Sequence, residues 1–243
     1  MSGSAQQRPR EPKYYIVKRH LLDVIEALEP GEALPTERDL AAELVTSRTT
    51  IRQAMLDLVA EGRLVRRQGS GSYVAEPKMS WPLHLSSFTS QAAANGLVAS
   101  TQLIAAERIR PDEDTAGRLG VGRGSSVFRI ERLRLADDRP IALETSHLSA
   151  ARFPRLTAYV RREQSLYRVL AAIYHVAPAS AEQSISTAPA SPSVAELLRT
   201  DTGAPMLVLG RHSFDAAGEP VEWVTSWYRG DRIMLVAQMT APR

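Results

Sequence analysis

The stretch VTSRTTIRQAM, residues 45–55, carries arginines and hydroxyls where an amphipathic helix usually carries glutamate and lysine. Arg48 and Arg52 are four residues apart, so they share one face of a helix, and Thr49 and Gln53 form the neighbouring row. The planar fork of an arginine can bond both acceptors of a guanine in the major groove, and a threonine can bond a phosphate or contact a thymine methyl. A solvated helix face is the alternative for any one of these side chains.

A second set of chemically capable residues lies in the stretch 127–148. In the alternating pattern of a strand, Arg132 and Arg134 share one face, and Glu144 and Ser146 share one face of the returning strand. These residues could form an ordinary cross-strand salt bridge. They could also line a pocket, and the residues alone leave both interpretations open.

Hydroxyls at two expected helix starts could complete such a pocket. Ser165 can cap a helix with Tyr167 in its first turn, and the stretch 85–96, LSSFTSQAAANG, starts another helix with serines and a threonine. Free N–H groups at helix starts attract anions, so an arginine pair beside them would suit a phosphate. Glu222 and Tyr228, on a later strand, would suit the hydroxyl or amino groups of a sugar.

Three helices are expected around the arginine-rich face. Apolar residues at spacings of four, three and four predict a first helix over residues 14–28. Thr36 and Asp39 fit the spacing of a capping box at the start of a second helix. Ser47 can cap the third helix after a tight turn. The apolar row of this third helix points away from the arginines and consists of Ile51, Met55 and Leu58.

A β-hairpin is expected next, over residues 64–74, LVRRQGSGSYV. Three helices, a tight turn and a terminal hairpin predict a winged helix-turn-helix, whose third helix enters the major groove. Gly69 would let the wing approach the minor groove closely, and Arg66 and Arg67 suit phosphates. Arg38, near the start of the second helix, is placed to cross the DNA backbone.

The remainder of the chain contains a weak internal repeat. GRLGVGRGSSVFRIERLRL aligns with ELLRTDTGAPMLVLGRHSF at an offset of 79, so that Arg132 matches Arg211. RPIALETSHL then aligns with EPVEWVTSWY at an offset of 80. Each half predicts a strand, a short helix and a hairpin with a polar tip. We therefore expect an α+β domain of antiparallel strands in a pseudo-twofold arrangement, with chance similarity of two hairpins as the alternative.

The domain boundaries follow from composition. Residues 1–12 are polar with two prolines and predict a disordered tail. The winged helix-turn-helix domain is expected over residues 13–76. Residues 77–82 predict a linker, because a proline among polar residues stops the strand before it. The second domain is expected over residues 83–243.

Composition excludes several classes of protein. The chain has 243 residues, 44% of them apolar, which is enough for two domains with real cores. It has no cysteine, which excludes disulfides and thiolate metal sites and fits the cytoplasm. The net charge of +3 does not favour a sequence-indifferent DNA binder, which relies on dense positive charge. No apolar run approaches the roughly 18 residues of a membrane span, and the start of the chain lacks the apolar core of a secretion signal.

The N-terminal domain resembles the GntR family of bacterial transcription regulators. The match covers residues 13–77 and includes LPTERDLAAEL and VTSRTTIRQAMLDLVAEGRLVRRQGSGSYV. The resemblance implies that the arginines at 38, 48 and 52 contact operator DNA and that the wing glycine reaches the minor groove. Ser70 departs from the Lys or Arg of many relatives, which leaves wing phosphate contacts to the arginines before it. The predicted DNA-binding set is Arg38, Arg48, Thr49, Thr50, Arg52, Gln53, Arg66, Arg67 and Gly69.

The second domain resembles the UTRA effector domain of the HutC subfamily, and within it the N-acetylglucosamine regulators of the DasR and NagR type. FRIERLRLADDRPIALETSHL, SLY and PVEWVTSWYRGDR carry the match. The resemblance implies a chorismate-lyase-like fold that binds glucosamine-6-phosphate or N-acetylglucosamine-6-phosphate. HutC relatives vary their ligands, so a different small metabolite is the alternative. The implied phosphate positions are Thr89, Arg132, Arg134, Ser165 and Tyr167. The implied sugar positions are Glu144, Arg211, Glu222 and Tyr228, and Phe88 completes the predicted effector set.

An enzyme is the alternative from another class, because the implied fold resembles a lyase scaffold. The five histidines fall on separate predicted elements without the spacing of metal ligands. His147, beside the expected pocket, is interpreted as a packed or hydrogen-bonding residue and not as a general base. Fold similarity alone does not imply catalysis. We therefore expect no enzyme activity, no cofactor and no metal site.

The sequence as a whole predicts a cytoplasmic, homodimeric transcription regulator that acts as a repressor. One recognition helix per subunit would read one half of a roughly palindromic operator. The second domain would form the dimer and bind the effector, and the ligand would reorient the DNA-binding heads about residues 77–82. Such a ligand acts only through its different affinities for the two states. No membrane partner is expected.

Overall fold

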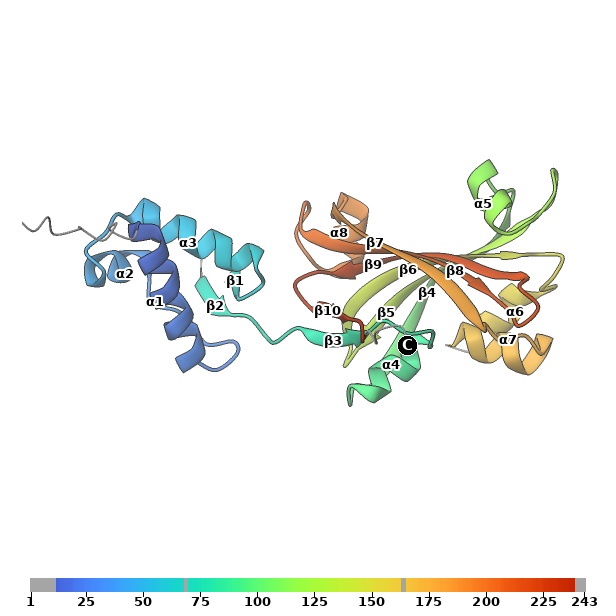
Figure 1. Ribbon diagram of the computed structural model, residues 1–243, viewed down its shortest axis with the longest axis horizontal. Helices are drawn as coiled ribbons and strands as arrows, with labels where there is room; N and C mark the ends of the chain where they lie inside the picture. Colours follow the sequence, from blue (N-terminus) through green and yellow to red (C-terminus); the bar gives the residue numbers. More distant parts are fainter. Residues whose placement is uncertain (1–11, 68–69, 163–164, 239–243) are drawn as a thin grey trace, which may run out of the picture. The chain divides into compact units, whose positions relative to one another are not determined.

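The computed structural model describes residues 12–67, 70–162 and 165–238 (Figure 1). The chain divides into two compact units, and the boundary lies between Lys78 and Met79. Pro12 is the one residue of the predicted tail that the structure describes.

The first unit is a winged helix-turn-helix, as predicted. Its elements are α1 (Lys13–Ala27), α2 (Glu37–Glu43), α3 (Arg48–Ala60), β1 (Leu64–Arg67) and β2 (Gly71–Val74). The two strands pair antiparallel to form the wing, with Leu64 opposite Val74. Leu21, Ile51 and Leu58 are fully buried between the helices, so the predicted inward face of α3 is confirmed. Burial of such a side chain contributes about 1.5–3 kcal/mol.

Two local features fix where α3 begins. Ser47 Oγ accepts a hydrogen bond from the Thr50 amide at 3.1 Å, which confirms the predicted cap. Val45 has a φ of 47°, a left-handed conformation that is rare for a β-branched residue, and it turns the chain sharply between α2 and α3. The predicted cap of α2 is confirmed as well, because Thr36 Oγ1 accepts from the Asp39 amide at 3.3 Å.

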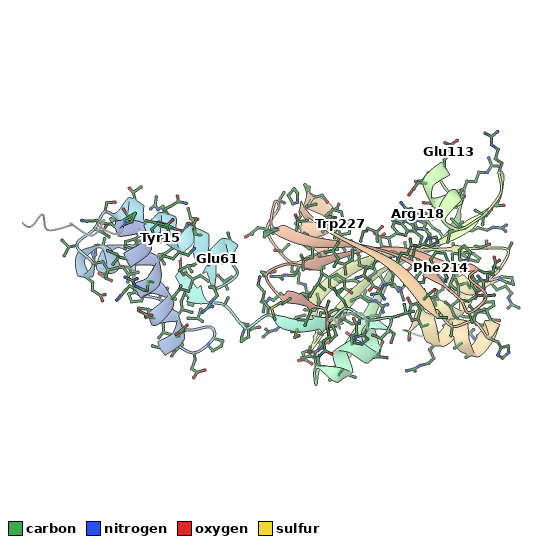
Figure 2. The ribbon with its side chains drawn as sticks, viewed as in Figure 1. Tyr15, Glu61, Glu113, Arg118, Phe214 and Trp227 are labelled. Atoms are coloured by element: carbon green, nitrogen blue, oxygen red, sulfur yellow. The ribbon has the colours of Figure 1, made fainter. Side chains whose placement is uncertain are left out.

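Polar contacts bind α1 to α3. Lys18 Nζ lies 2.5 Å from Oε1 of Glu61. Glu61, which is labelled in Figure 2, directly follows the last residue of α3. Tyr14 of α1 donates a hydrogen bond to Asp57 of α3. The orientation of α3 relative to α1 is therefore held by polar contacts as well as by the core.

The second unit is built on a six-stranded antiparallel sheet with the strand order β4-β5-β6-β9-β8-β7. Its strands are β4 (Ala99–Ile109), β5 (Val127–Ala136), β6 (Arg139–Ser149), β7 (Ser180–Pro189), β8 (Pro205–Phe214) and β9 (Pro220–Arg229). Its helices are α4 (Phe88–Ala94), α5 (Glu113–Arg118), α6 (Leu156–Val160), α7 (Leu166–Tyr174) and α8 (Pro192–Leu198).

The predicted internal repeat is present in the chain order of these elements. The first half runs β4, α5, β5, β6 and the second runs β7, α8, β8, β9. The halves meet in the middle of the sheet, where β6 pairs with β9. Strand, short helix and hairpin therefore occur twice, in the predicted pseudo-twofold arrangement.

Helices cover both faces of this sheet. Figure 1 shows α4, α6 and α7 on one side and α5 and α8 on the other. Leu148, Leu156 and Leu170 pack together under α6 and α7, and Leu143 packs with Leu198 under α8. Alternate residues of one strand therefore belong to different cores.

A two-stranded parallel sheet is separate from the six-stranded sheet. It is formed by β3 (Met79–Pro82) and β10 (Ile233–Val236). The sequence analysis assigned residues 79–82 to the linker, but the structure places them in the second unit. Trp81 of β3 is buried against Phe88 at 5.3 Å between ring centroids, and this packing explains the difference. The connection between the units is correspondingly shorter, since β2 ends at Val74.

Candidate functional site

Four predicted DNA-reading side chains point outward from the first two turns of α3. Arg48, Thr49, Arg52 and Gln53 are exposed, on the side opposite the buried row of this helix. Arg48 forms no ion pair with any residue that the structure describes. Arg48 is therefore free to meet an external acceptor.

The other predicted DNA-binding residues surround this face. The side chain of Arg38, at the start of α2, is 82% exposed. Thr50 is half-buried, and its hydroxyl lies 2.8 Å from the Ser47 hydroxyl, within the helix cap. Gly69 and the side chain of Arg67 lie outside the part of the chain that the structure describes.

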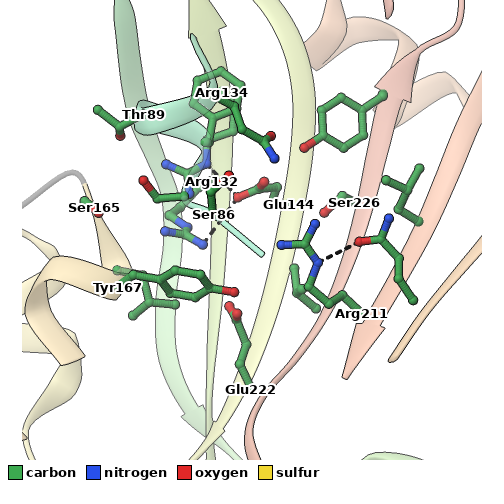
Figure 3. Close-up of a pocket in the computed structure, with 18 residues that line it drawn as sticks. Ser86, Thr89, Arg132, Arg134, Glu144, Ser165, Tyr167, Arg211, Glu222 and Ser226 are labelled. Carbon is green, nitrogen blue, oxygen red and sulfur yellow. Dashed lines mark hydrogen bonds and ion pairs between the residues drawn. The ribbon is translucent and has the colours of Figure 1, made fainter. Parts of the chain in front are cut away.

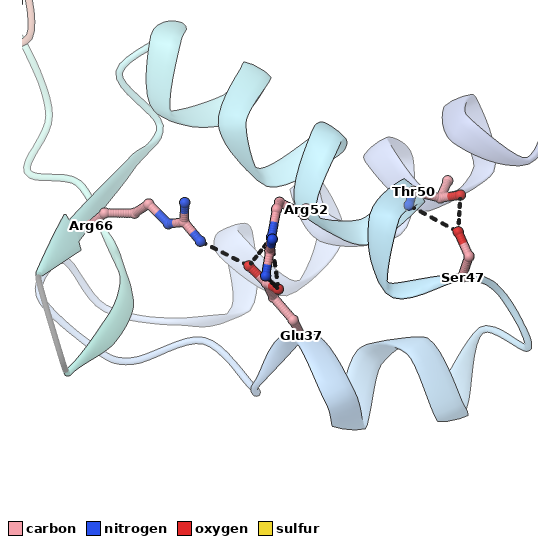
Figure 4. Close-up of polar contacts among 5 residues, drawn as sticks. All are labelled: Glu37, Ser47, Thr50, Arg52 and Arg66. Atoms are coloured by element: carbon pink, nitrogen blue, oxygen red, sulfur yellow. Dashed lines mark hydrogen bonds and ion pairs between the residues drawn. The ribbon is translucent and has the colours of Figure 1, made fainter.

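Glu37 joins three elements of this surface, which the sequence analysis missed (Figure 4). Its carboxylate accepts hydrogen bonds from Arg52 of α3 at 3.0 and 3.2 Å and from Arg66 of β1 at 2.8 Å. The hydrogen bonds and the negative charge of Glu37 raise the pKa of Arg52. Two of the predicted DNA contacts thus share one carboxylate in the protein without DNA.

The second unit contains a pocket over the centre of its sheet, between the starts of α4 and α7 (Figure 3). It has about 560 Å³ of space between the lining atoms, part of which is open to solvent. All ten residues of the predicted effector set line it: Phe88, Thr89, Arg132, Arg134, Glu144, Ser165, Tyr167, Arg211, Glu222 and Tyr228. They come from β5, β6, β8, β9 and the two helix starts.

Arg132 and Arg134 form the cationic wall of the pocket. Arg134 Nε lies 2.6 Å from Glu144 Oε2, and Arg132 Nη2 lies 3.4 Å from the same oxygen. Arg132 Nη2 also donates to the Ser146 hydroxyl at 3.1 Å. The cross-strand salt bridge and the pocket, which were alternatives in the sequence, are both present, because the paired side chains face the cavity.

The donors of Arg132 are not all used. Its side chain is buried, yet Nε and Nη1 have no hydrogen-bond partner among the residues that the structure describes. Burial, followed by the positive charge of Arg134, lowers the pKa of Arg132 to about 10, so it stays charged at neutral pH. Buried charged donors without acceptors are unfavourable, and an anion in the pocket would satisfy them. The buried hydroxyl of Ser86, which also lines the pocket, likewise has no hydrogen-bond partner in the described part of the chain.

The negative charge of the pocket comes from two buried carboxylates. Burial acts to raise the pKa of Glu144, but the charges of Arg134 and Arg132 outweigh it and hold that pKa below its usual value. Figure 3 shows the carboxylate of Glu222 and the hydroxyl of Tyr167 pointing toward each other. Glu222 is 2% exposed.

Neutral hydroxyls and an engaged arginine complete the lining. Burial and the charge of Glu222 raise the pKa of Tyr167, and burial and the charge of Glu144 raise that of Tyr228. Both phenols therefore remain donors at neutral pH. Arg211 donates from Nε to the Gln183 side chain at 2.6 Å. Gln183, on β7, is a lining residue that the sequence analysis missed, and no local pattern marks it.

The start of α7 takes the predicted form. Ser165 Oγ accepts from the Arg168 amide at 3.4 Å, and Tyr167 lies in the first turn with its side chain at the pocket. At the start of α4, Ser87 Oγ accepts from the Ser90 amide at 3.2 Å. Both helices thus present capped N-termini beside Arg132.

His147 does not lie beside this pocket, contrary to the sequence analysis. Its neighbour Ser146 accepts a hydrogen bond from Arg132 and so lies on the same face of the sheet as the pocket, and alternation along β6 turns His147 to the opposite face. There it stands in register with Trp223, whose ring lies 4.0 Å from the Arg118 guanidinium carbon. In residues 12–67, 70–162 and 165–238, no three acidic or histidine side chains are grouped to hold a metal ion. Within the same ranges, no helix is long and apolar enough to cross a membrane.

Comparison with known proteins gives two adjacent family matches. Residues 14–74 match the model of bacterial regulatory proteins of the gntR family, and residues 94–234 match that of the UTRA domain. The chain is 36% identical to the HTH-type transcriptional repressor PhnF of Mycolicibacterium smegmatis, over 98% of this chain and 97% of that protein. It is 35% identical to the HTH-type transcriptional repressor NagR of Bacillus subtilis, over 94% of this chain and 95% of that protein.

A solved structure gives the same result at the level of the fold. The crystal structure of PhnF from Mycobacterium smegmatis matches with a TM-score of 0.65 and 34% sequence identity. The match covers 93% of this chain and 100% of that chain. The names of these relatives are those of transcriptional repressors and not of enzymes.

Proposed function

Because the chain belongs to the GntR family of bacterial regulatory proteins and joins its DNA-binding unit to a UTRA domain, we propose that it is a cytoplasmic, dimeric repressor whose operator binding is controlled by a phosphorylated amino sugar. It is a transcription regulator and not an enzyme, as predicted.

The DNA-binding surface is proposed to be the exposed face of α3 with Arg38 and the wing. Arg48 and Arg52 would enter the major groove from the start of the helix, where helix-turn-helix proteins contact base edges. A good bidentate contact between an arginine and a guanine supplies about 1–3 kcal/mol of discrimination. Arg66 would bind phosphate beside the groove.

The unpartnered donors of Arg132 carry the proposal for the effector. Nε and Nη1 of a buried, charged guanidinium require acceptors, and a phosphate offers several. Glu144 and Glu222 line the same pocket and would accept hydrogen bonds from hydroxyl or amino groups. A ligand for this pocket would carry an anionic group for the arginines and hydrogen-bond donors for the carboxylates. Glucosamine-6-phosphate and N-acetylglucosamine-6-phosphate carry both.

Control of DNA binding would pass through the start of the second unit. Trp81 of β3 packs against Phe88 and Tyr228, which both line the pocket. An effector that favours one arrangement of these rings would bias the connection that precedes β3. Dimerisation through the second unit would then set the spacing of two DNA-binding heads, to which operator affinity is sensitive.

A thermal-shift screen tests the effector. The full chain is heated with amino-sugar phosphates, the same sugars without phosphate, and inorganic phosphate. We expect the phosphorylated amino sugars to raise the melting temperature most, because they alone engage both the arginines and the carboxylates. A larger shift with an unphosphorylated or unrelated metabolite would overturn the assignment, while the family and its DNA-binding unit would stand.

A further inference from the structure

Glu37 places a negative charge in the middle of the surface assigned to DNA. Its carboxylate is bonded by Arg52 of the recognition helix and by Arg66 of the wing. The Glu37 side chain is 14% exposed, whereas those of Arg52 and Arg66 are 57% and 44% exposed. The carboxylate therefore lies beneath two arginines whose outer edges face solvent.

Stability does not explain this arrangement. Pairs with exposed arginines contribute little to stability, commonly about 0–1 kcal/mol. The cap of α2 is supplied by Thr36 and not by Glu37. A carboxylate at this place would also repel DNA phosphates and neutralise cations that attract them. Its presence lowers affinity for DNA in general, so a compensating role is needed.

The geometry of the contacts indicates what that role is. Arg52 donates from Nε and Nη2 to Glu37, and its Nη1 bonds to no residue that the structure describes (Figure 4). A guanidinium held along one edge has a fixed plane and a fixed direction for the other edge. Arg66 uses only Nη2, on the second carboxylate oxygen, so one residue ties the wing to the recognition helix.

We propose that Glu37 is a positioning residue for operator reading, which orients Arg52 and Arg66 together and so increases selectivity at the expense of affinity for random DNA. This inference rests on the proposed DNA-binding surface. Preorganised side chains lose less freedom on binding, and the advantage applies only to a sequence that meets them in their fixed orientation. A random duplex gains nothing from the orientation and is still repelled by the carboxylate.

Two substitutions separate orientation from charge. Glu37→Gln removes the charge and loosens both arginines. Glu37→Asp keeps the charge on a side chain one methylene shorter, which cannot reach both partners in the same way. The matched control is Glu43→Gln, because Glu43 is on the same helix and pairs with His20 and with no arginine among the described residues.

The measurement uses the full chain and two duplexes of equal length and composition. One is selected from a random pool by the unmodified protein, and the other is its scrambled version. For Glu37→Gln we expect affinity for the scrambled duplex to rise and the ratio of selected to scrambled affinity to fall about tenfold. For Glu37→Asp we expect the ratio of selected to scrambled affinity to fall without a rise in affinity for the scrambled duplex. For Glu43→Gln we expect no change in this ratio.

The role of Arg52 is tested in the same assay. If Glu37 acts through Arg52, then Glu37→Gln lowers the ratio less in an Arg52→Ala background than in the unmodified chain. An unchanged ratio in Glu37→Gln overturns the inference, and so does an equal loss for both duplexes with a lower melting temperature. Arg48→Ala tests the proposed DNA-binding surface separately. If Arg48→Ala loses operator binding while the Glu37 variants behave like the unmodified chain, the proposed function stands and only the role of Glu37 is refuted.

Discussion

Arg132 of β5 and Glu144 of β6 stand directly opposite each other in the sheet register, and only Nη2 of the arginine approaches the carboxylate, at 3.4 Å. Glu144 makes its shorter contact, 2.6 Å, with Arg134. Arg132 is therefore the less engaged member of the pair. Its remaining nitrogens are buried and have no hydrogen-bond partner among the described residues, and Arg132 is one of the residues that line the pocket.

Replacing Arg132 with alanine should weaken the binding of a phosphorylated amino sugar far more than the binding of its unphosphorylated form. A hydrogen bond to a charged group contributes about 1.5–3 kcal/mol, so we expect a loss of about 10- to 100-fold for the phosphosugar. Calorimetric titration of both sugars measures the difference. Arg129→Ala is the control, because Arg129 lies on the same strand and pairs instead with Glu107 and Glu131. An equal loss for both sugars would remove the phosphate role.

Glu144→Gln should destabilise the second unit. The substitution removes the carboxylate that pairs with two buried arginines, and breaking a buried pair in this way costs about 3–5 kcal/mol. Urea unfolding of the full chain measures the effect. The matched control is Glu107→Gln, which removes a partner of Arg129 from a carboxylate that is 51% exposed and should cost no more than about 1 kcal/mol. Similar losses in the two variants would contradict the assigned energetics.

The same carboxylate should make stability depend on pH. The pKa of Glu144 is lowered in the folded protein, and an unfolded glutamate has a pKa of about 4.3. The ionised form therefore contributes stability that is fully present above the unfolded pKa and is lost as pH falls through the folded pKa. Unfolding free energies between about pH 6 and about pH 3 should fall more steeply in the unmodified chain than in Glu144→Gln. Parallel curves would assign the acid sensitivity to other groups.

Arg48→Ala should strongly weaken operator binding and leave effector binding unchanged. Arg48 is exposed at the start of α3 and pairs with no described carboxylate, so its loss removes a contact without disturbing the core. We expect operator affinity to fall by about 10- to 100-fold or more. Fluorescence anisotropy on the selected duplex measures this, with Arg19→Ala on α1 as the charge-matched control. Unchanged operator affinity in Arg48→Ala would refute the assigned face.

Local signals in the sequence were sufficient for much of this molecule. The caps at Thr36 and Ser47 depend on residues three positions apart, and the structure has both hydrogen bonds. Alternation along strands placed Arg132 and Glu144 on one face, and the repeat placed Arg211 at the position equivalent to Arg132. The complete effector set was implied by the resemblance to UTRA domains, and in the structure all of its members line one pocket.

Contacts between distant segments were not predictable in the same way. Met79 pairs with Ile233, and a parallel pair so far apart in the chain leaves no turn signal between its strands. The bridge from Glu37 to Arg52 and Arg66 depends on the reach of long side chains between separate elements. Whether the donors of Arg132 have acceptors depends on the positions of all neighbouring groups, and the sequence does not give these positions.

The pairing of β3 with β10 has a consequence for the history of such proteins. The second unit opens with β3, and its last described strand lies beside that opening strand. Each unit is therefore one continuous stretch of the chain, and the polypeptide passes from the first unit to the second once. One recombination event near Lys78 would be sufficient to join the second unit to a different DNA-binding unit, or the first unit to a different effector domain.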